Sequence, residues 1–109
     1  MTFPDEKYEE IGSFADAYFG HIIKAAASVD RVKLVQAADV LEQTYQKNQT
    51  LYVCGNGGSA AISSTFVCDH TKLVQTDTNL TARVVSLAGN MSMLTAIAND
   101  LSYDEIFLY

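Results

Sequence analysis

The fold of this chain is decided by residues 51–61, which read Leu51-Tyr52-Val53-Cys54-Gly55-Asn56-Gly57-Gly58-Ser59-Ala60-Ala61. The first four are apolar and are bounded by turn formers, which predicts a strand over residues 50–54 that is buried on both faces. Three glycines in four positions predict a tight loop over residues 55–59. Ser59 is placed to cap a helix over residues 59–72. The segment therefore predicts a strand–loop–helix unit of the kind found in parallel sheets.

Two helical patterns precede this strand. Apolar residues at steps of three and four predict helices over about residues 5–28 and 30–48, with Asp30 as the N-cap of the second. The apolar stripe of the first helix is widened by Phe19 and Ile23 beyond what one core contact requires. That helix is therefore either central and well buried or packed on another subunit.

A second strand and helix follow the glycine loop. After a polar loop at residues 76–81, Val84 and Val85 predict a strand over residues 82–87. Residues 91–101 predict a further helix. Two strands joined through a helix run parallel with a right-handed crossover. The predicted fold class is α/β, in a single domain.

Two strands alone make a poor parallel sheet, because such sheets are stable when several strands are covered on both faces. Near the end of the chain, Ser102 and Glu105 form a capping-box pattern that opens a new helix, and four apolar residues later the sequence stops at Tyr109. We therefore expect the chain to be the N-terminal part of a longer α/β domain. The alternative is a small complete domain that completes its sheet by oligomerising.

The amino-acid composition limits the kinds of partner that this chain is expected to bind. The 109 residues include 7 basic and 13 acidic side chains, a net charge of −6, which argues against nucleic-acid binding. A hydrophobic share of 49% with 18% charged residues is that of a globular protein, and no apolar run is long enough to span a membrane. Cys54 and Cys68 are too few for a disulfide framework and are expected to be reduced and buried. We expect a cytoplasmic protein without nucleic-acid or membrane partners.

The glycine loop is the strongest candidate for a binding site. Its glycines let a ligand approach the backbone, and the following helix offers unpaired N–H groups to an anion or a sugar oxygen. The alternative is a tight turn without a ligand, but Asn56 and Ser59 favour the ligand loop. The spacing of Gly55, Gly57 and Ala60 matches a dinucleotide fingerprint, yet no carboxylate follows the second strand. A P-loop requires a lysine where Ser59 stands, so both nucleotide readings are disfavoured.

Residues 51–61 resemble the first strand and loop of the sugar isomerase (SIS) domain family, most closely the bacterial phosphoheptose (sedoheptulose-7-phosphate) isomerases. A second block is similar to the family's stretch after its second strand; it reads Leu94-Thr95-Ala96-Ile97-Ala98-Asn99-Asp100 and then Tyr103-Asp104-Glu105-Ile106-Phe107. The resemblance runs from about Phe14 to Tyr109 and covers the N-terminal half, or somewhat more, of a family domain. It implies an SIS-type three-layer parallel sheet, flavodoxin-like and doubly wound, preceded by two helices.

The resemblance also implies an activity. Family members are cytoplasmic homotetramers with active sites between subunits, and they interconvert sedoheptulose 7-phosphate and a heptose 7-phosphate for lipopolysaccharide or capsule heptose. In this aldose–ketose isomerisation a base removes a proton next to the carbonyl, an enediol forms, and an acid returns the proton to the neighbouring carbon. The alternative is a non-catalytic SIS module that binds a sugar phosphate or a protein partner in a regulatory role. The family's phosphate loop and catalytic histidine lie beyond Tyr109, so we expect the 109-residue chain by itself to be inactive.

Substrate-binding roles carry over to two groups of residues. One is the glycine loop with its flanking serine. The other is a polar pair at the end of the last predicted helix; the alternative is that this pair only forms a polar helix end without a role in binding. The members are Asn56, Gly57, Gly58, Ser59, Asn99 and Asp100.

The helix after the glycine loop departs from the family pattern. Family members place there a His and, four residues later, a Glu on one helical face, as a zinc ligand and the catalytic base. This chain has Thr65 and Asp69 at those positions. Threonine is a poor zinc ligand, so no cofactor is firmly predicted, although the resemblance implies zinc. Asp69 is the candidate catalytic base, one methylene shorter than Glu; the alternative is a solvated helix carboxylate.

The neighbours of Asp69 offer one further option. A helical step of 100° points His70 away from Asp69, so His70 is expected at the surface or at an interface. A metal cluster of Cys68, Asp69 and His70 requires the helix to break at this point, because adjacent residues on an intact helix do not converge.

Overall fold

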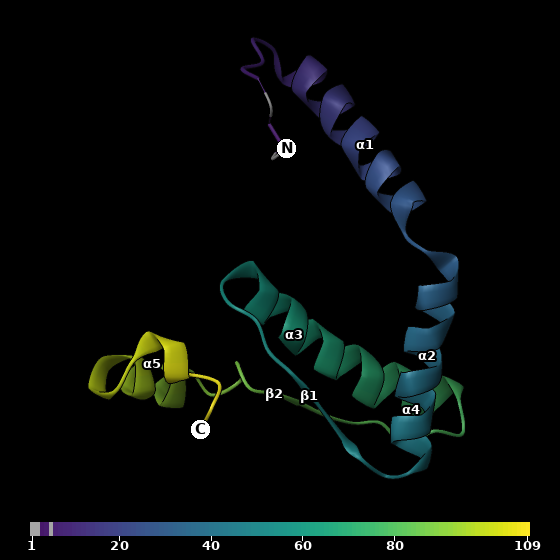
Figure 1. The fold of residues 1–109 in the computed structure, drawn as a ribbon, viewed down its shortest axis with the longest axis vertical. Helices are drawn as coiled ribbons and strands as arrows, with labels where there is room; N and C mark the ends of the chain where they lie inside the picture. The colour runs from purple at the N-terminus through teal and green to yellow at the C-terminus, as the bar shows by residue number, and fades with distance from the viewer. Residues whose placement is uncertain (1–2, 5) are drawn as a thin grey trace. The chain divides into compact units, whose positions relative to one another are not determined.

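The structure, a computed structural model, describes residues 3–4 and 6–109 (Figure 1). The elements are α1 (Ile11–Ser28), α2 (Arg31–Gln46), β1 (Thr50–Val53), α3 (Gly58–Asp69), the π-helical turn η1 (His70–Val74), α4 (Gln75–Asp77), β2 (Arg83–Ser86), α5 (Met91–Asp100) and the 3-10 turn η2 (Tyr103–Glu105). The chain divides into two compact units, one ending at Ala38 and the other formed by Asp39–Tyr109. No helix in the part of the chain that the structure describes is long and apolar enough to cross a membrane.

The first unit contains α1, which begins at Ile11 and not near residue 5. Residue 5 itself lies outside the described residues, but residues 6–10 are not helical, so the predicted start was wrong. The ring of Phe14 lies 5.2 Å from that of Phe3 and 5.6 Å from that of Tyr8, measured between centroids. The preceding segment therefore packs its aromatic side chains onto α1 and does not extend it.

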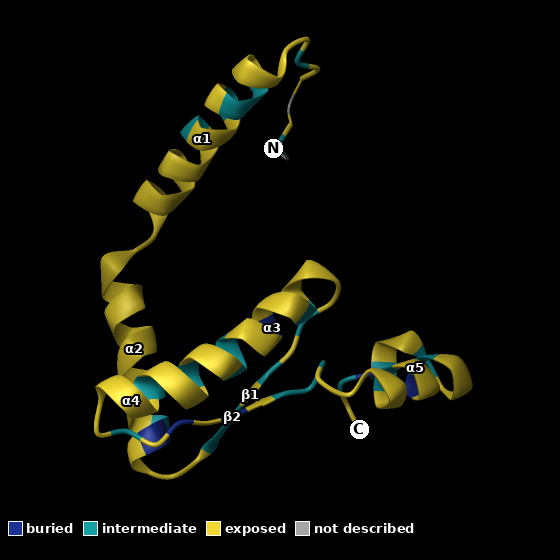
Figure 2. Ribbon diagram, turned by 180° about the vertical axis from the view of Figure 1, so that it is seen from behind, coloured by how far each residue is buried: buried dark blue, intermediate teal, exposed yellow. Residues whose placement is uncertain are grey.

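Of the two alternatives for the first helix, the central and well-buried helix is not found, and packing on another subunit stays a prediction. Among the described residues α1 buries none (Figure 2). The side chain of Phe19 is 60% exposed. The apolar stripe predicted from the sequence is present, and within the first unit the rings of Phe3 and Tyr8 contact it near Phe14.

Both ends of α2 are fixed by local hydrogen bonds. Asp30 Oδ1 accepts a bond from the Val32 N–H at 2.9 Å, which confirms the predicted N-cap. At the other end Asn48 has a positive φ of 54°, and the Gln49 N–H donates to the Thr44 carbonyl at 2.9 Å. This is the Schellman arrangement, in which asparagine is one of the few residues that tolerate the left-handed conformation.

The second unit is built on a parallel pair of strands. β1 and β2 pair in parallel, with Tyr52 opposite Val85, as the sequence predicted. Tyr45, Ala82 and Val84 are buried in one cluster, against which α3 packs Phe66 and Val67. The prediction that β1 is buried on both faces was wrong. Figure 2 shows α3 along one side of the strands, and the Tyr52 side chain is 63% exposed.

The helix after the glycine loop is longer than predicted. It begins at Gly58 and continues from α3 through η1 and α4 to Asp77, so the polar loop starts only at Thr78. Val74 packs against the buried cluster, which holds this part of the helix on the sheet. Residues 76 and 77 were predicted to belong to the polar loop, but they form an exposed helical turn.

The segment after β2 is close to its prediction. Asn90 caps α5 by accepting a hydrogen bond from the Met93 N–H at 3.0 Å. Ser102 accepts one from the Asp104 N–H at 3.0 Å, and so acts as the expected cap. The element that it opens is, however, the single 3-10 turn η2 and not a new α-helix.

Candidate functional site

The glycine loop joins β1 to α3 by close backbone contact. A Cβ placed on Gly55 would lie 2.6 Å from the carbonyl carbon of Ser59, so only glycine fits there. Gly57 has a φ of 55° and a ψ of −121°, a conformation that residues with a side chain rarely adopt. Gly58 has open space where a Cβ would be. Two of the three glycines are therefore required by the turn itself.

The loop leaves hydrogen-bond donors free. The N-cap of α3 is Gly57, and no side chain caps the helix, so the prediction that Ser59 is the cap was wrong. The Ser59 N–H donates to the Asn56 carbonyl at 3.0 Å, whereas the N–H groups of Gly57 and Gly58 have no partner within the described chain. Unpaired N–H groups at the start of a 12-residue helix are suited to an anionic or polar oxygen.

A pocket of about 210 Å³ opens beside this loop. One wall consists of residues 55–57 and Ala60, and the other of the facing side of α5 together with Tyr103 and Ile106. The lining contains no charged side chain. The structure therefore places the loop residues Asn56 and Gly57 at a hollow that a small neutral group can enter.

The second predicted group of substrate contacts lies outside this pocket. Asn99 and Asp100 are exposed at the end of α5, where Asn99 Nδ2 donates to Asp100 Oδ1 at 2.7 Å. Their neighbour Ala98 lines the pocket, but they do not. Within one chain the structure thus does not bring the polar pair to the glycine loop.

Asp69 also lies far from the loop. It is the last residue of α3, 11 positions after Gly58, which corresponds to about 16 Å along the helix axis. The side chain is exposed. Within one chain Asp69 therefore does not reach the pocket beside Asn56.

The residues around Asp69 do not suit zinc. Thr65 Oγ1 donates to the Ala61 carbonyl at 3.1 Å, so this hydroxyl serves its own helix. The helix does not break at Cys68 but continues as a π-turn, and the described residues contain no group of three or more His, Cys, Asp or Glu that could hold a metal ion.

His70 forms a contact that the sequence analysis missed. Its Nδ1 is hydrogen bonded to the Tyr45 hydroxyl at 2.7 Å, and its ring stacks on Phe66 with centroids 3.8 Å apart. His70 is therefore not the free surface side chain that was one expectation, and its place at an interface stays a prediction. The only signal was the spacing of four residues between Phe66 and His70, which places them on one helical face. Burial raises the pKa of Tyr45 above its usual value of 10.0.

The prediction that the two cysteines are buried was also wrong. Both are free, as expected, but both are exposed. Cys54 follows a strand with one uncovered face, and Cys68 lies on α3 away from the buried cluster.

Known proteins resemble this chain in sequence and in structure. It is 30% identical over 103 residues to phosphoheptose isomerase from Chlorobaculum tepidum, covering 94% of this chain and 49% of that protein. It is 34% identical over 93 residues to a probable phosphoheptose isomerase from Thermoplasma acidophilum, covering 85% and 50%. The solved structure of phosphoheptose isomerase GmhA from Neisseria gonorrhoeae superposes with a TM-score of 0.72 at 31% identity, covering 89% of this chain and 51% of that one.

The chain therefore spans about half the length of these relatives. The SIS domain family matches residues 16–109, which is most of the sequence. The strand, glycine loop and helix described above lie within this match, and so does the parallel pairing of β1 with β2. The chain belongs to the SIS domain family.

Proposed function

We propose that this chain is part of a phosphosugar aldose–ketose isomerase of the phosphoheptose isomerase type, which interconverts sedoheptulose 7-phosphate and a heptose 7-phosphate. The observation that carries the proposal is the pair of unpaired N–H groups on Gly57 and Gly58, beside an uncharged pocket. The names of the relatives supply the reaction class. Oriented N–H donors are what a developing oxyanion or a phosphate oxygen requires.

Asp69 is the proposed base. A ligand at the glycine loop of one chain is not within reach of Asp69 of the same chain, which lies about 16 Å away along α3. The proposal therefore includes a homotetramer in which each site takes its loop and its base from different copies. A cytoplasmic location, as expected for a sugar phosphate enzyme, belongs to the same proposal.

A non-catalytic SIS module is the second candidate. Two observations favour it: the Thr65 hydroxyl bonds within its own helix, and the Asp69 carboxylate has no partner among the described residues that would orient it. A base that is not held in place loses much of its effect, because a displacement of about 1 Å can lower the rate roughly a hundredfold. Such a module would bind a sugar phosphate or a protein partner without turnover.

Turnover of sedoheptulose 7-phosphate by the complete gene product separates the two candidates. For an isomerase, Asp69→Asn should lower kcat by about 10²- to 10⁴-fold, since it removes the general base and keeps the shape. Asp77→Asn is the matched control, because Asp77 is another exposed aspartate on the same helical segment.

Full activity of the Asp69→Asn variant would show that Asp69 is not the base. Tight binding of the sugar phosphate without turnover in the wild type would favour the non-catalytic module. The 109-residue chain by itself is expected to show no turnover.

A further inference from the structure

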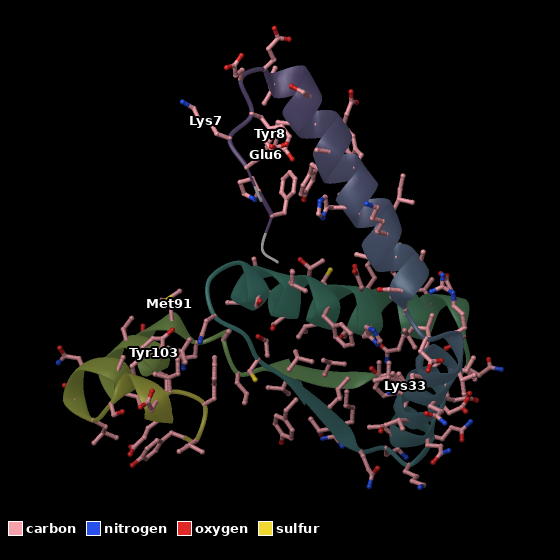
Figure 3. The ribbon with its side chains drawn as sticks, turned by 45° about the horizontal axis from the view of Figure 1, so that its top comes forward. Glu6, Lys7, Tyr8, Lys33, Met91 and Tyr103 are labelled. Atoms are coloured by element: carbon pink, nitrogen blue, oxygen red, sulfur yellow. The ribbon has the colours of Figure 1, made fainter. Side chains whose placement is uncertain are left out.

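The pocket beside the glycine loop has a wall to which the proposed function assigns no role. Tyr103 is the first residue of η2 and lines the pocket together with Met91 of α5; Figure 3 shows their side chains on neighbouring segments. The hydrogen bond from the Asp104 N–H to Ser102 holds the turn that presents Tyr103. The Tyr103 side chain is 59% exposed, so its ring is accessible to a ligand.

The polar groups available in this pocket are few. The Thr95 hydroxyl donates to the Met91 carbonyl at 2.9 Å and is therefore used within α5. Two polar side-chain groups in the pocket lining have no hydrogen-bond partner among the described residues. They are the Asn56 amide and the Tyr103 hydroxyl. They come from two different elements, one from the glycine loop and one from η2.

The rest of the lining decides which part of a phosphosugar can enter. Ala60, Leu94 and Ala98 offer only apolar surface, and no lysine, arginine or histidine lines the pocket. A phosphate placed there would lose its hydration without gaining a cation, which is unfavourable. A carbon chain can place its C–H groups against the alanine and leucine side chains and its hydroxyls near Asn56 and Tyr103.

We propose that Tyr103 is a specificity-determining residue, which contacts the uncharged, hydroxyl-bearing carbon chain of the ligand while the phosphate lies outside this pocket. The inference rests on the proposed function, because it takes the ligand to be a phosphosugar. The ring packs against C–H groups of the ligand and the hydroxyl bonds to one sugar hydroxyl. Asn56 completes the contact from the glycine loop.

The test compares two ligands by titration calorimetry on the complete gene product, sedoheptulose 7-phosphate and inorganic phosphate. Tyr103→Ala should raise the Kd for the sugar phosphate by about tenfold, the scale of one lost aromatic contact, and Tyr103→Phe by roughly threefold. Neither variant should change the Kd for inorganic phosphate. Tyr52→Ala is the matched control, since Tyr52 is similarly exposed, at 63%, and does not line the pocket.

Each other outcome has its own meaning. Wild-type affinity of Tyr103→Ala for the sugar phosphate would overturn the inference and leave the proposed function standing. Equal weakening for both ligands would also overturn it, because it would show a general loss of the site. If the wild type binds neither ligand, the proposed function itself fails. Circular dichroism and the urea midpoint confirm that each variant is folded.

Discussion

The two ends of α3 are built in opposite ways. At the N-terminal end, backbone lies against backbone: Gly55 contacts Ser59, and no side chain caps the helix. At the C-terminal end, side chains make the contacts: His70 is bonded to Tyr45 and stacked on Phe66. The first end leaves its N–H groups free for a ligand, whereas the second uses its polar atoms inside the fold. The proposed binding site and a structural anchor thus lie at opposite ends of one helix.

The largest expected effect concerns the N-terminal end. Gly55→Ala places a Cβ 2.6 Å from backbone atoms of Ser59, which cannot move without shifting α3. We expect a loss of roughly 3 kcal/mol in the free energy of unfolding, measured in urea. Gly58→Ala is the control, because the space beside Gly58 is open, and it should change the free energy by less than about 0.5 kcal/mol. Equal values for the two variants would contradict the tight backbone contact.

A smaller effect is expected at the C-terminal end. Tyr45→Phe removes the hydrogen bond to His70 and should lower the free energy of unfolding by about 1 kcal/mol. His70→Ala also leaves the buried Tyr45 hydroxyl without a partner and removes the stacking on Phe66, so about 2 kcal/mol is expected. Tyr52→Phe, at an exposed tyrosine, should have almost no effect. If the His70→Ala variant is as stable as the wild type, the contacts of His70 do not stabilise the C-terminal end of α3.

The smallest expected effect is a pH dependence of the free energy of unfolding, which arises from Tyr45 at the C-terminal end of α3. Burial raises the pKa of Tyr45 above 10.0, so the folded state keeps the phenol proton to higher pH than the unfolded state does. The corresponding stability is complete below about pH 10 and is lost as the pH rises through the folded-state pKa. Urea titrations between pH 8 and pH 11 should show a steeper decline for the wild type than for Tyr45→Phe. Parallel curves would contradict this prediction.

Much of the fold was predictable because local signals were strong. Asp30 and Asn90 cap their helices through bonds to nearby N–H groups, which depend only on sequence neighbours. The parallel pairing of β1 with β2 follows from a helical connection between two apolar segments. The glycine spacing indicated a tight loop, and the contact between Gly55 and Ser59 is the reason for it.

The parts that were predicted wrongly depend on tertiary contacts. Residues 75–77 are polar, but Val74 packs against the buried cluster and the helix continues past it. His70 reaches Tyr45, which is 25 positions earlier, and no local pattern reports such a pairing. In the candidate site, a role in binding or catalysis was predicted for Asn56, Asp69 and Asn99 alike, because spacing along a chain does not show which residues line the same pocket. The structure places only Asn56 of these at the pocket.

The π-turn η1 also bears on how this region tolerates changes in length. A π-turn closes each hydrogen bond one residue later than an α-helix does, so His70–Val74 holds one residue more than α-helical winding needs. Removal of an exposed residue such as Lys72 would let the segment rewind as uninterrupted α-helix, without lengthening the path to β2. The glycine loop has no such reserve, since a deletion there would break the contact that joins strand to helix. Among relatives of this chain, gains and losses of single residues should therefore gather near residue 72 and be rare between residues 55 and 59.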